Sequence, residues 1–320
     1  MTVAIIGGTG FIGTAVAERL VARGHRPVVV ARGEHPVRLP EGAVFERGDR
    51  MDGERLREIF RAHGVDTVID IFALGLLNTR TLLDAVAETG GRYLLLSSVD
   101  VYANYGGLLR KETPPVQPHP ARETDPLRQS RFPYRGNSRR PSGVENDLFE
   151  DYDKIILEEA ALGDCRFATT VIRAPMIFGP GDKQHRFKWA IDAVKGGGLV
   201  KLDERAGKWP NSYGYLTDVA EAIALAALHP RAAGQVYNVG QNFVRTPIEW
   251  LLTFAVVMNR RIEVETVPAA EQALLSERAE ASDLRYPLTL DTTRIRDELG
   301  FAEVVPERDA LLATIAYEAG

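Results

Sequence analysis

The feature that most constrains this chain is a glycine-rich turn near its start, Gly7-Gly8-Thr9-Gly10-Phe11-Ile12-Gly13. It follows an apolar, strand-like run at residues 2–6 and opens a segment of helical periodicity, in which Ile12, Val16 and Leu20 share one face. Such a turn lets the backbone approach a pyrophosphate, and the helix N-terminus offers that anion unpaired N–H groups. Because a strand precedes the pattern and a helix follows it, the turn predicts a dinucleotide-binding site.

Strand-like and helical runs alternate through the first half of the chain. Apolar runs at residues 28–31, 66–72 and 93–97 indicate strands, and runs at 54–63 and 80–89 indicate helices. Alternating units of this length predict an α/β fold, a doubly wound parallel sheet of the Rossmann type with helices on both faces.

The second half of the chain mixes helices with short extended pieces. A helix is expected at residues 147–162 and a strand at 169–173. We expect a dinucleotide-binding domain at residues 1–172 and a smaller, mixed substrate lobe at 173–320, partly interleaved with the first domain. A ligand would lie in the cleft between them, beyond the carboxyl ends of the strands.

A polar stretch rich in proline and arginine runs from about residue 113 to residue 143. Proline lacks the backbone donor that regular elements need, so this stretch is expected to form a long loop. Long loops in compact domains are often functional lids, and the alternative is a surface excursion without a role.

The composition of the chain limits the classes of binding partner and the cell compartment that we expect. A net charge of −5 gives no basic footprint, so we expect no nucleic acid partner. The only cysteine, Cys165, allows no internal disulfide and fits a reducing compartment. There is no signal-like leader and no run of about 18 apolar residues, so we expect no membrane partner and a cytoplasmic protein.

Several further motifs, taken together and in order, resemble the extended short-chain dehydrogenases/reductases, the NAD(P)-dependent epimerase/dehydratase family. Beside the glycine-rich turn they are Gly48-Asp49, Ser97-Ser98 through Val101-Tyr102, Lys154 with Glu158, Arg173-Ala174-Pro175, Phe178-Gly179-Pro180-Gly181, Tyr215 to Ala220 and Tyr237-Asn238-Val239-Gly240. The resemblance implies an epimerase, dehydratase or reductase. Its substrate would be a small molecule that reacts at a carbinol or ketone carbon: a sugar, a nucleotide sugar or a similar polar metabolite. It also implies a possible homodimer.

The resemblance assigns roles to individual residues. It implies that Asp49 lies against the adenine and that Ser98 is the catalytic serine. It also implies that Lys154 is catalytic: it binds the nicotinamide ribose and lowers the pKa of a neighbouring acid. The other residues expected to bind the cofactor are Gly7, Thr9, Gly10, Phe11, Ile12, Gly13, Arg50 and Pro175, and Tyr102 is expected at the substrate.

The end of the second strand bears on the choice of cofactor. NAD enzymes of this type usually end that strand with a carboxylate that accepts the ribose hydroxyls, whereas here Ala31 is followed by Arg32. A guanidinium can bind a 2′-phosphate bidentately. Arg32 therefore favours NADP, with NAD possible because Glu34 lies close enough to accept from a ribose.

The family carries a tyrosine four residues before its lysine, which puts both side chains on one helix face. Here that position is Glu150, and Tyr152 would lie about 200° from Lys154 around a regular helix. Three alternatives remain: Glu150 is the catalytic base, the helix begins irregularly and Tyr152 takes the vacant place, or acid/base work passes to Asp100. Glu150 also has capping-box spacing with Asp147.

His185 and Arg186, which follow the strand at 169–173, are weaker candidates for substrate binding. His185 and Arg186 are placed at the substrate, although a lone histidine is more often structural and a basic residue more often solvated. No second histidine stands at metal-ligand spacing, so no metal is expected. Two other classes stay open: a non-catalytic dinucleotide-binding sensor or regulatory protein, and an RNA-binding member of the family, against which the acidic balance argues.

Overall fold

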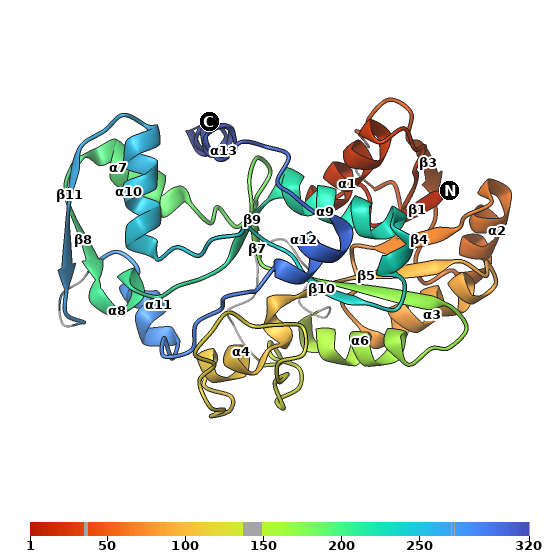
Figure 1. Ribbon diagram of the computed structural model, residues 1–320, viewed down its shortest axis with the longest axis horizontal. Coiled ribbons are helices and arrows are strands. Elements are labelled where there is room, and N and C mark those ends of the chain that lie inside the picture. The colour runs from red at the N-terminus through yellow and green to blue at the C-terminus, as the bar shows by residue number, and fades with distance from the viewer. Residues whose placement is uncertain (35–37, 137–148, 270, 272, 320) are drawn as a thin grey trace.

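The computed structural model describes residues 1–34, 38–136, 149–269, 271 and 273–319 (Figure 1). Among these residues the largest sheet has seven strands in the order β10-β6-β5-β4-β1-β2-β3, and every neighbouring pair is parallel. These strands are β1 (Val3–Ile6), β2 (Val28–Ala31), β3 (Val44–Arg47), β4 (Thr67–Asp70), β5 (Arg92–Ser98), β6 (Ala168–Ala174) and β10 (Val236–Asn238). The order turns back on either side of β1, so the predicted doubly wound α/β fold is confirmed.

Helices cover both faces of this sheet (Figure 1). One apolar cluster joins β1 and β6 to α1 (Phe11–Ala22), α9 (Leu216–Leu228) and α12 (Thr293–Leu299). A second cluster joins the opposite face to α2 (Gly53–His63), α3 (Leu76–Ala87) and α6 (Lys154–Leu162). The central strands are buried on both sides, which explains their continuous apolar sequences.

A second group of elements forms the left part of Figure 1 around its own apolar cluster. It contains a two-stranded parallel sheet of β8 (Gly198–Asp203) and β11 (Ile262–Val267), and the helices α7 (Lys188–Gly196) and α10 (Pro247–Val257). The remaining elements are η1 (Val99–Val101), α4 (Ala103–Leu108), β7 (Met176–Phe178), α8 (Glu204–Gly207), β9 (Tyr213–Tyr215), η2 (Pro230–Ala232), α11 (Ser276–Ala281) and α13 (Glu307–Ala319).

The chain returns to the first part of the molecule after residue 172. Strand β10 pairs with β6, and α9 packs against α1. The Asp218 carboxylate of α9 accepts from the backbone N–H groups of Val304 and Val305, which ties the C-terminal segment to α9. The boundary at residue 172 with an interleaved second lobe stays a proposal.

Two expectations about local structure were wrong. The helix expected at 147–162 is interrupted: among the described residues, 149–150 are helical, 151–153 leave the helical path, and α6 begins at Lys154, where the Asp153 carboxylate caps it. Strand β3 was missed because it is a half-exposed edge strand whose sequence, VFER, carries no apolar run. Of the stretch expected as a loop, residues 113–136 contain no helix or strand, and residues 137–143 lie outside the described residues.

Candidate functional site

The glycine-rich turn lies between β1 and α1, and its glycines differ in the space around them. A Cβ on Gly13 would lie 2.4 Å from the Gly7 carbonyl oxygen and 2.5 Å from the Gly8 Cα, so the helix could not approach the strand. Gly7 has a φ of +81°, which L side chains rarely adopt. Gly10 has room for a side chain: an added Cβ would make an ordinary van der Waals contact with the Gly7 carbonyl oxygen, 3.6 Å away.

No side chain caps the N-terminus of α1, which leaves it able to bind an anion. Its N-cap is Gly10, no side chain caps it, and its first turn holds no acidic residue. The N–H groups of the first turn and the positive end of the helix dipole therefore lie beside Gly10 without a side-chain partner. These features fit a pyrophosphate, since only a bare backbone allows the anion to come this close.

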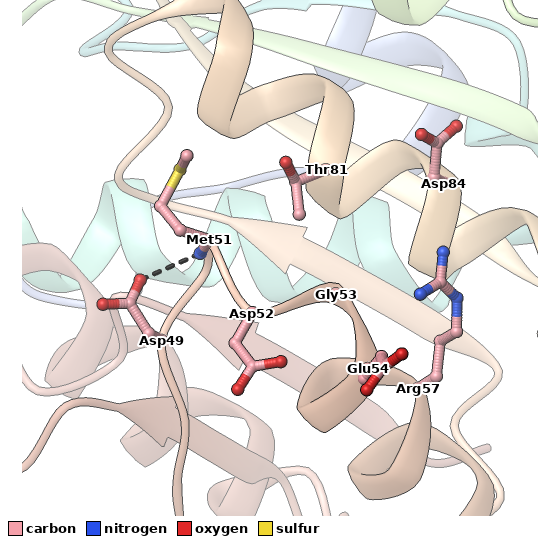
Figure 2. Close-up of a pocket in the computed structure, with 8 residues that line it drawn as sticks. All are labelled: Asp49, Met51, Asp52, Gly53, Glu54, Arg57, Thr81 and Asp84. Carbon is pink, nitrogen blue, oxygen red and sulfur yellow. Dashed lines mark hydrogen bonds between the residues drawn. The ribbon is translucent and has the colours of Figure 1, made fainter.

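Asp49 follows β3 at the same edge of the sheet and lines a pocket of about 550 Å³ (Figure 2). One carboxylate oxygen accepts from the Met51 N–H at 2.8 Å, which fixes the side chain at the rim. The pocket lies between α2 and α3, and most of its charged residues are acidic: Asp49, Asp52, Glu54 and Asp84, with Arg57 as the cation. Such a lining repels phosphate and suits the amino group of a base.

Arg32 and Glu34 follow β2 and pair with each other, with 3.0 Å between Nη2 and Oε2. Both side chains are more than half exposed. Glu34 therefore competes with a 2′-phosphate for the Arg32 guanidinium. Exposed ion pairs of this kind contribute little free energy.

Tyr152, Asp100 and Ser98 come together at the carboxyl end of β5. The Tyr152 hydroxyl donates to the Asp100 carboxylate at 2.7 Å and also hydrogen-bonds Ser98. Burial, and then the Asp100 charge, raise the pKa of Tyr152 well above its ordinary value, so the hydroxyl keeps its proton. Burial also raises the pKa of Asp100, and its Oδ1 has no hydrogen-bond partner among the described residues.

Lys154 is the first residue of α6 and is buried beside this group. Its Nζ donates to the carbonyl oxygens of Ala73, at 2.6 Å, and Leu96, at 2.7 Å. The nitrogen also lies 5.8 Å from the centre of the Tyr152 ring. Burial lowers the pKa of Lys154 to about 8, so the side chain can change its charge near neutral pH. An ammonium has three donors, and two are used here.

Glu150 is not one helical turn before Lys154. The helical turn at residues 149–150 ends before Asp151, and one Glu150 carboxylate oxygen accepts from the Gly136 N–H at 3.2 Å. The spacing argument that made Glu150 equivalent to the family's tyrosine therefore does not hold, because it assumes a continuous helix. Its alternative as a capping-box partner involves Asp147, which lies outside the described residues.

Sequence reasoning missed the residues that enclose this group. Arg128, from the proline-rich stretch, is fully buried and pairs with Asp153 at 2.7 Å, and its Nε donates to the Asp100 carbonyl. The hydroxyls of Tyr105 and Tyr134 lie 2.6 Å apart, and the Tyr134 ring packs on Tyr152 with centres 5.2 Å apart. No periodicity marks Arg128 or Tyr134 in a loop, or Tyr105 in the short helix α4, so no sequence signal points to them.

The structure places the remaining expected site residues in varied surroundings. Tyr102 is buried, donates to Asn238 at 2.6 Å and accepts from Arg173 at 3.1 Å. His185 lies 2.7 Å from the Glu318 carboxylate, and Arg186 pairs with Asp182 at 2.5 Å. Their roles at a substrate stay predictions.

Phe11 and Pro175, also expected to bind the cofactor, lie in the glycine-rich turn and between β6 and β7. The Phe11 ring lies 3.3 Å from where a Cβ on Gly181 would be, so the turn contacts the loop after β7. Pro175 joins β6 to β7, and its ring lies 3.3 Å from where a Cβ on Gly240 would be.

Residues 3–135 match the model of the NAD dependent epimerase/dehydratase family. This part of the chain is similar to that family. The match covers the glycine-rich turn, Asp49, Ser98 and Asp100, and the resemblance to the extended short-chain dehydrogenases/reductases is confirmed.

Two curated relatives extend the similarity. A 2-alkyl-3-oxoalkanoate reductase of Stenotrophomonas maltophilia is 26% identical over 75% of this chain and 70% of its own length. A chloroplast stem-loop binding protein of 41 kDa from Arabidopsis thaliana is 25% identical over 75% of this chain, and the match spans 59% of that protein.

Among solved structures, a UDP-glucose 4-epimerase from Stenotrophomonas maltophila with bound NAD and formylated UDP-arabinopyranose superposes with a TM-score of 0.69. It is 18% identical and covers all of this chain and 98% of that one, so it supports the fold. Among the helices that the structure describes, none is long and apolar enough to cross a bilayer. Within the same residues, no group of three histidine, cysteine or acidic side chains is placed to hold a metal ion.

Proposed function

We propose that the protein is an NAD(P)-dependent enzyme that reduces or oxidises a carbonyl or carbinol carbon of a small polar metabolite. One observation carries the proposal. Tyr152, Asp100 and Lys154 lie together at the carboxyl ends of the parallel strands, where the glycine-rich turn also lies. In open parallel sheets, ligands bind beyond this edge. The similarity to a reductase and to the epimerase/dehydratase family supports the same class of chemistry.

The residues fit a nicotinamide dinucleotide. The backbone at Gly10 and the N-terminus of α1 would hold the pyrophosphate, and Asp49 would accept from the amino group of the adenine. The third N–H of Lys154 would donate to the nicotinamide ribose, because the other two are held by Ala73 and Leu96. When bound, the cofactor supplies or accepts the hydride.

Tyr152 and Asp100 would carry the proton. In the reducing direction the Tyr152 hydroxyl, kept protonated by burial and by the Asp100 charge, donates its proton to the substrate oxygen. Tyr152 then regains a proton through Asp100, whose raised pKa favours uptake from solvent. Ser98 orients the same hydroxyl. This assignment gives the acid role to Tyr152 and leaves Glu150 outside the chemistry.

A sugar, nucleotide sugar or similar polar metabolite is the proposed substrate class, and the family description allows epimerisation or dehydration as well as reduction. NADP is the proposed cofactor because of Arg32, with NAD as the alternative. A cytoplasmic location and a homodimer belong to the same proposal.

The test compares three variants in cofactor absorbance assays with ketone and nucleotide-sugar substrates. Tyr152→Phe and Asp100→Asn should each lower kcat by about a hundredfold or more, because they remove a positioned acid or its partner. Glu150→Gln is the matched control and should keep kcat within about threefold. Equal losses in Tyr152→Phe and Glu150→Gln would contradict the assignment. Cofactor binding without turnover of any substrate would favour a sensor.

A further inference from the structure

A second buried charge pair lies beside Lys154 and has no place in the chemistry above. Arg50 and Asp70 form a two-pronged ion pair with distances of 3.0 and 2.8 Å, and Asp70 is fully buried at the end of β4. The Tyr93 hydroxyl donates to the same carboxylate at 2.8 Å, and the Phe72 N–H donates to it at 3.2 Å. The carboxylate therefore has four hydrogen bonds.

Stability alone does not explain such a pair. Taking two charges out of water costs about as much as their attraction returns, and apolar replacements are often neutral or stabilising. A retained buried pair therefore calls for a specific consequence of its position.

The consequence lies in the segment from Asp70 to Ala73. Arg50 donates to the Phe72 carbonyl, and Lys154 donates to the Ala73 carbonyl at 2.6 Å. The two cations thus bind successive carbonyls of one segment. The same segment supports the glycine-rich turn, since a Cβ on Gly7 would lie 2.9 Å from the Phe72 Cβ.

Charge connects the pair to Lys154 as well. Burial is the main cause of the lowered Lys154 pKa, and four charged groups also shift this pKa. Asp70 from β4, Asp100 from η1 and Glu158 from α6 raise this pKa, and Arg50 lowers it. Among these charged groups Asp70 has the largest effect on the Lys154 pKa, and Arg50 acts in the opposite direction to Asp70.

We propose that Arg50 and Asp70 are positioning residues that hold the segment Asp70–Ala73, and through the Ala73 carbonyl the Lys154 ammonium, at the cofactor. The proposal rests on the proposed function for its purpose, but its physical content concerns Lys154 alone. Arg50 thus contributes to cofactor binding through the backbone of this segment, with its guanidinium held by Asp70.

The test follows the titration of Lys154 by NMR of protein labelled with ¹³C at lysine Cε. The chain has seven lysines, so Lys154→Arg identifies the signal by its loss. In Asp70→Asn the titration midpoint should fall by about one pH unit, because a nearby opposite charge is removed. In Arg50→Met it should rise, because the removed charge repels the ammonium.

Glu221→Gln is the matched control. Glu221 is also a buried carboxylate held by two arginines, Arg19 and Arg23, but it lies between α1 and α9 on the opposite face of the sheet. This variant should leave the Lys154 midpoint unchanged. Opposite shifts in the two test variants could not come from general loosening, which would move both midpoints the same way.

Isothermal calorimetry with NADP and NAD gives the second readout. Asp70→Asn and Arg50→Met should each weaken cofactor binding by about tenfold, and Glu221→Gln should not. Midpoints that stay still, or that move in one direction in both variants, overturn the proposal. If Asp70→Asn does not fold, Arg50→Met decides by the sign of its shift. The titration needs neither cofactor nor substrate, so failure of the proposed function leaves its outcome readable.

Discussion

The glycine-rich turn and the Tyr152 cluster lie at the same edge of the sheet but are built in different ways. The turn is made of backbone from seven consecutive residues and contains no charged side chain. The cluster is made of side chains from separate places in the chain: Ser98 at the end of β5 and Asp100 just after it, Tyr152 before α6 and Lys154 at its start, and Arg128 from the proline-rich stretch.

This difference teaches which kind of site tolerates change. A backbone site depends on the absence of side-chain atoms, so one added methyl group can abolish it. A side-chain cluster depends on where the chain bends, so its residues can shift along the sequence. Here the break at 151–153 brings Tyr152 to Asp100, although Tyr152 stands two residues from Lys154.

The largest effect is expected at the turn. Gly13→Ala places a Cβ 2.4 Å from the Gly7 carbonyl oxygen, so the protein should lose about 3 kcal/mol of unfolding free energy or more and bind no cofactor. Thermal unfolding and calorimetry measure both. Gly10→Ala is the control: its Cβ would make only an ordinary contact, 3.6 Å from the Gly7 carbonyl oxygen, so the melting temperature should hold while cofactor affinity falls. A stable, cofactor-binding Gly13→Ala would break the comparison.

An intermediate effect is expected from the ionisation of Lys154. Below its pKa of about 8 the ammonium has a third N–H for the cofactor, and above it that donor is lost. Cofactor affinity should therefore stay level at low pH and fall by about tenfold as the pH rises through 8. Calorimetry from pH 6 to pH 9.5 measures this fall. Lys154→Arg, whose guanidinium stays charged, should flatten the profile; an unchanged profile in that variant would assign the dependence to another group.

The smallest effect is expected at the rim of the turn. Arg32→Ala should weaken NADP binding by about fivefold and leave NAD binding unchanged, because an exposed ion pair contributes about 1 kcal/mol. Glu34→Ala should act oppositely by freeing Arg32. Equal losses for the two cofactors in Arg32→Ala would show that this arginine does not contact a 2′-phosphate.

The sequence by itself determined the alternation of strands and helices, the glycine-rich turn and its edge of the sheet. These depend on short-range physics: apolar runs of strand length, and glycines whose spacing suits one strand-turn-helix unit. Ser98 and Lys154 were named by the resemblance to the family, and their roles stay predictions.

Tertiary structure decided which side chains meet. The helix of Lys154 could have begun earlier by its sequence, but the Asp153 carboxylate caps it, pairs with buried Arg128 and accepts from the Phe132 N–H. Those partners come from a loop more than 20 residues earlier, so no local pattern encodes the break. The place of Tyr152 beside Asp100 follows from that long-range contact. Buried polar groups need hydrogen-bond partners, and here the fold supplies those partners from distant parts of the chain.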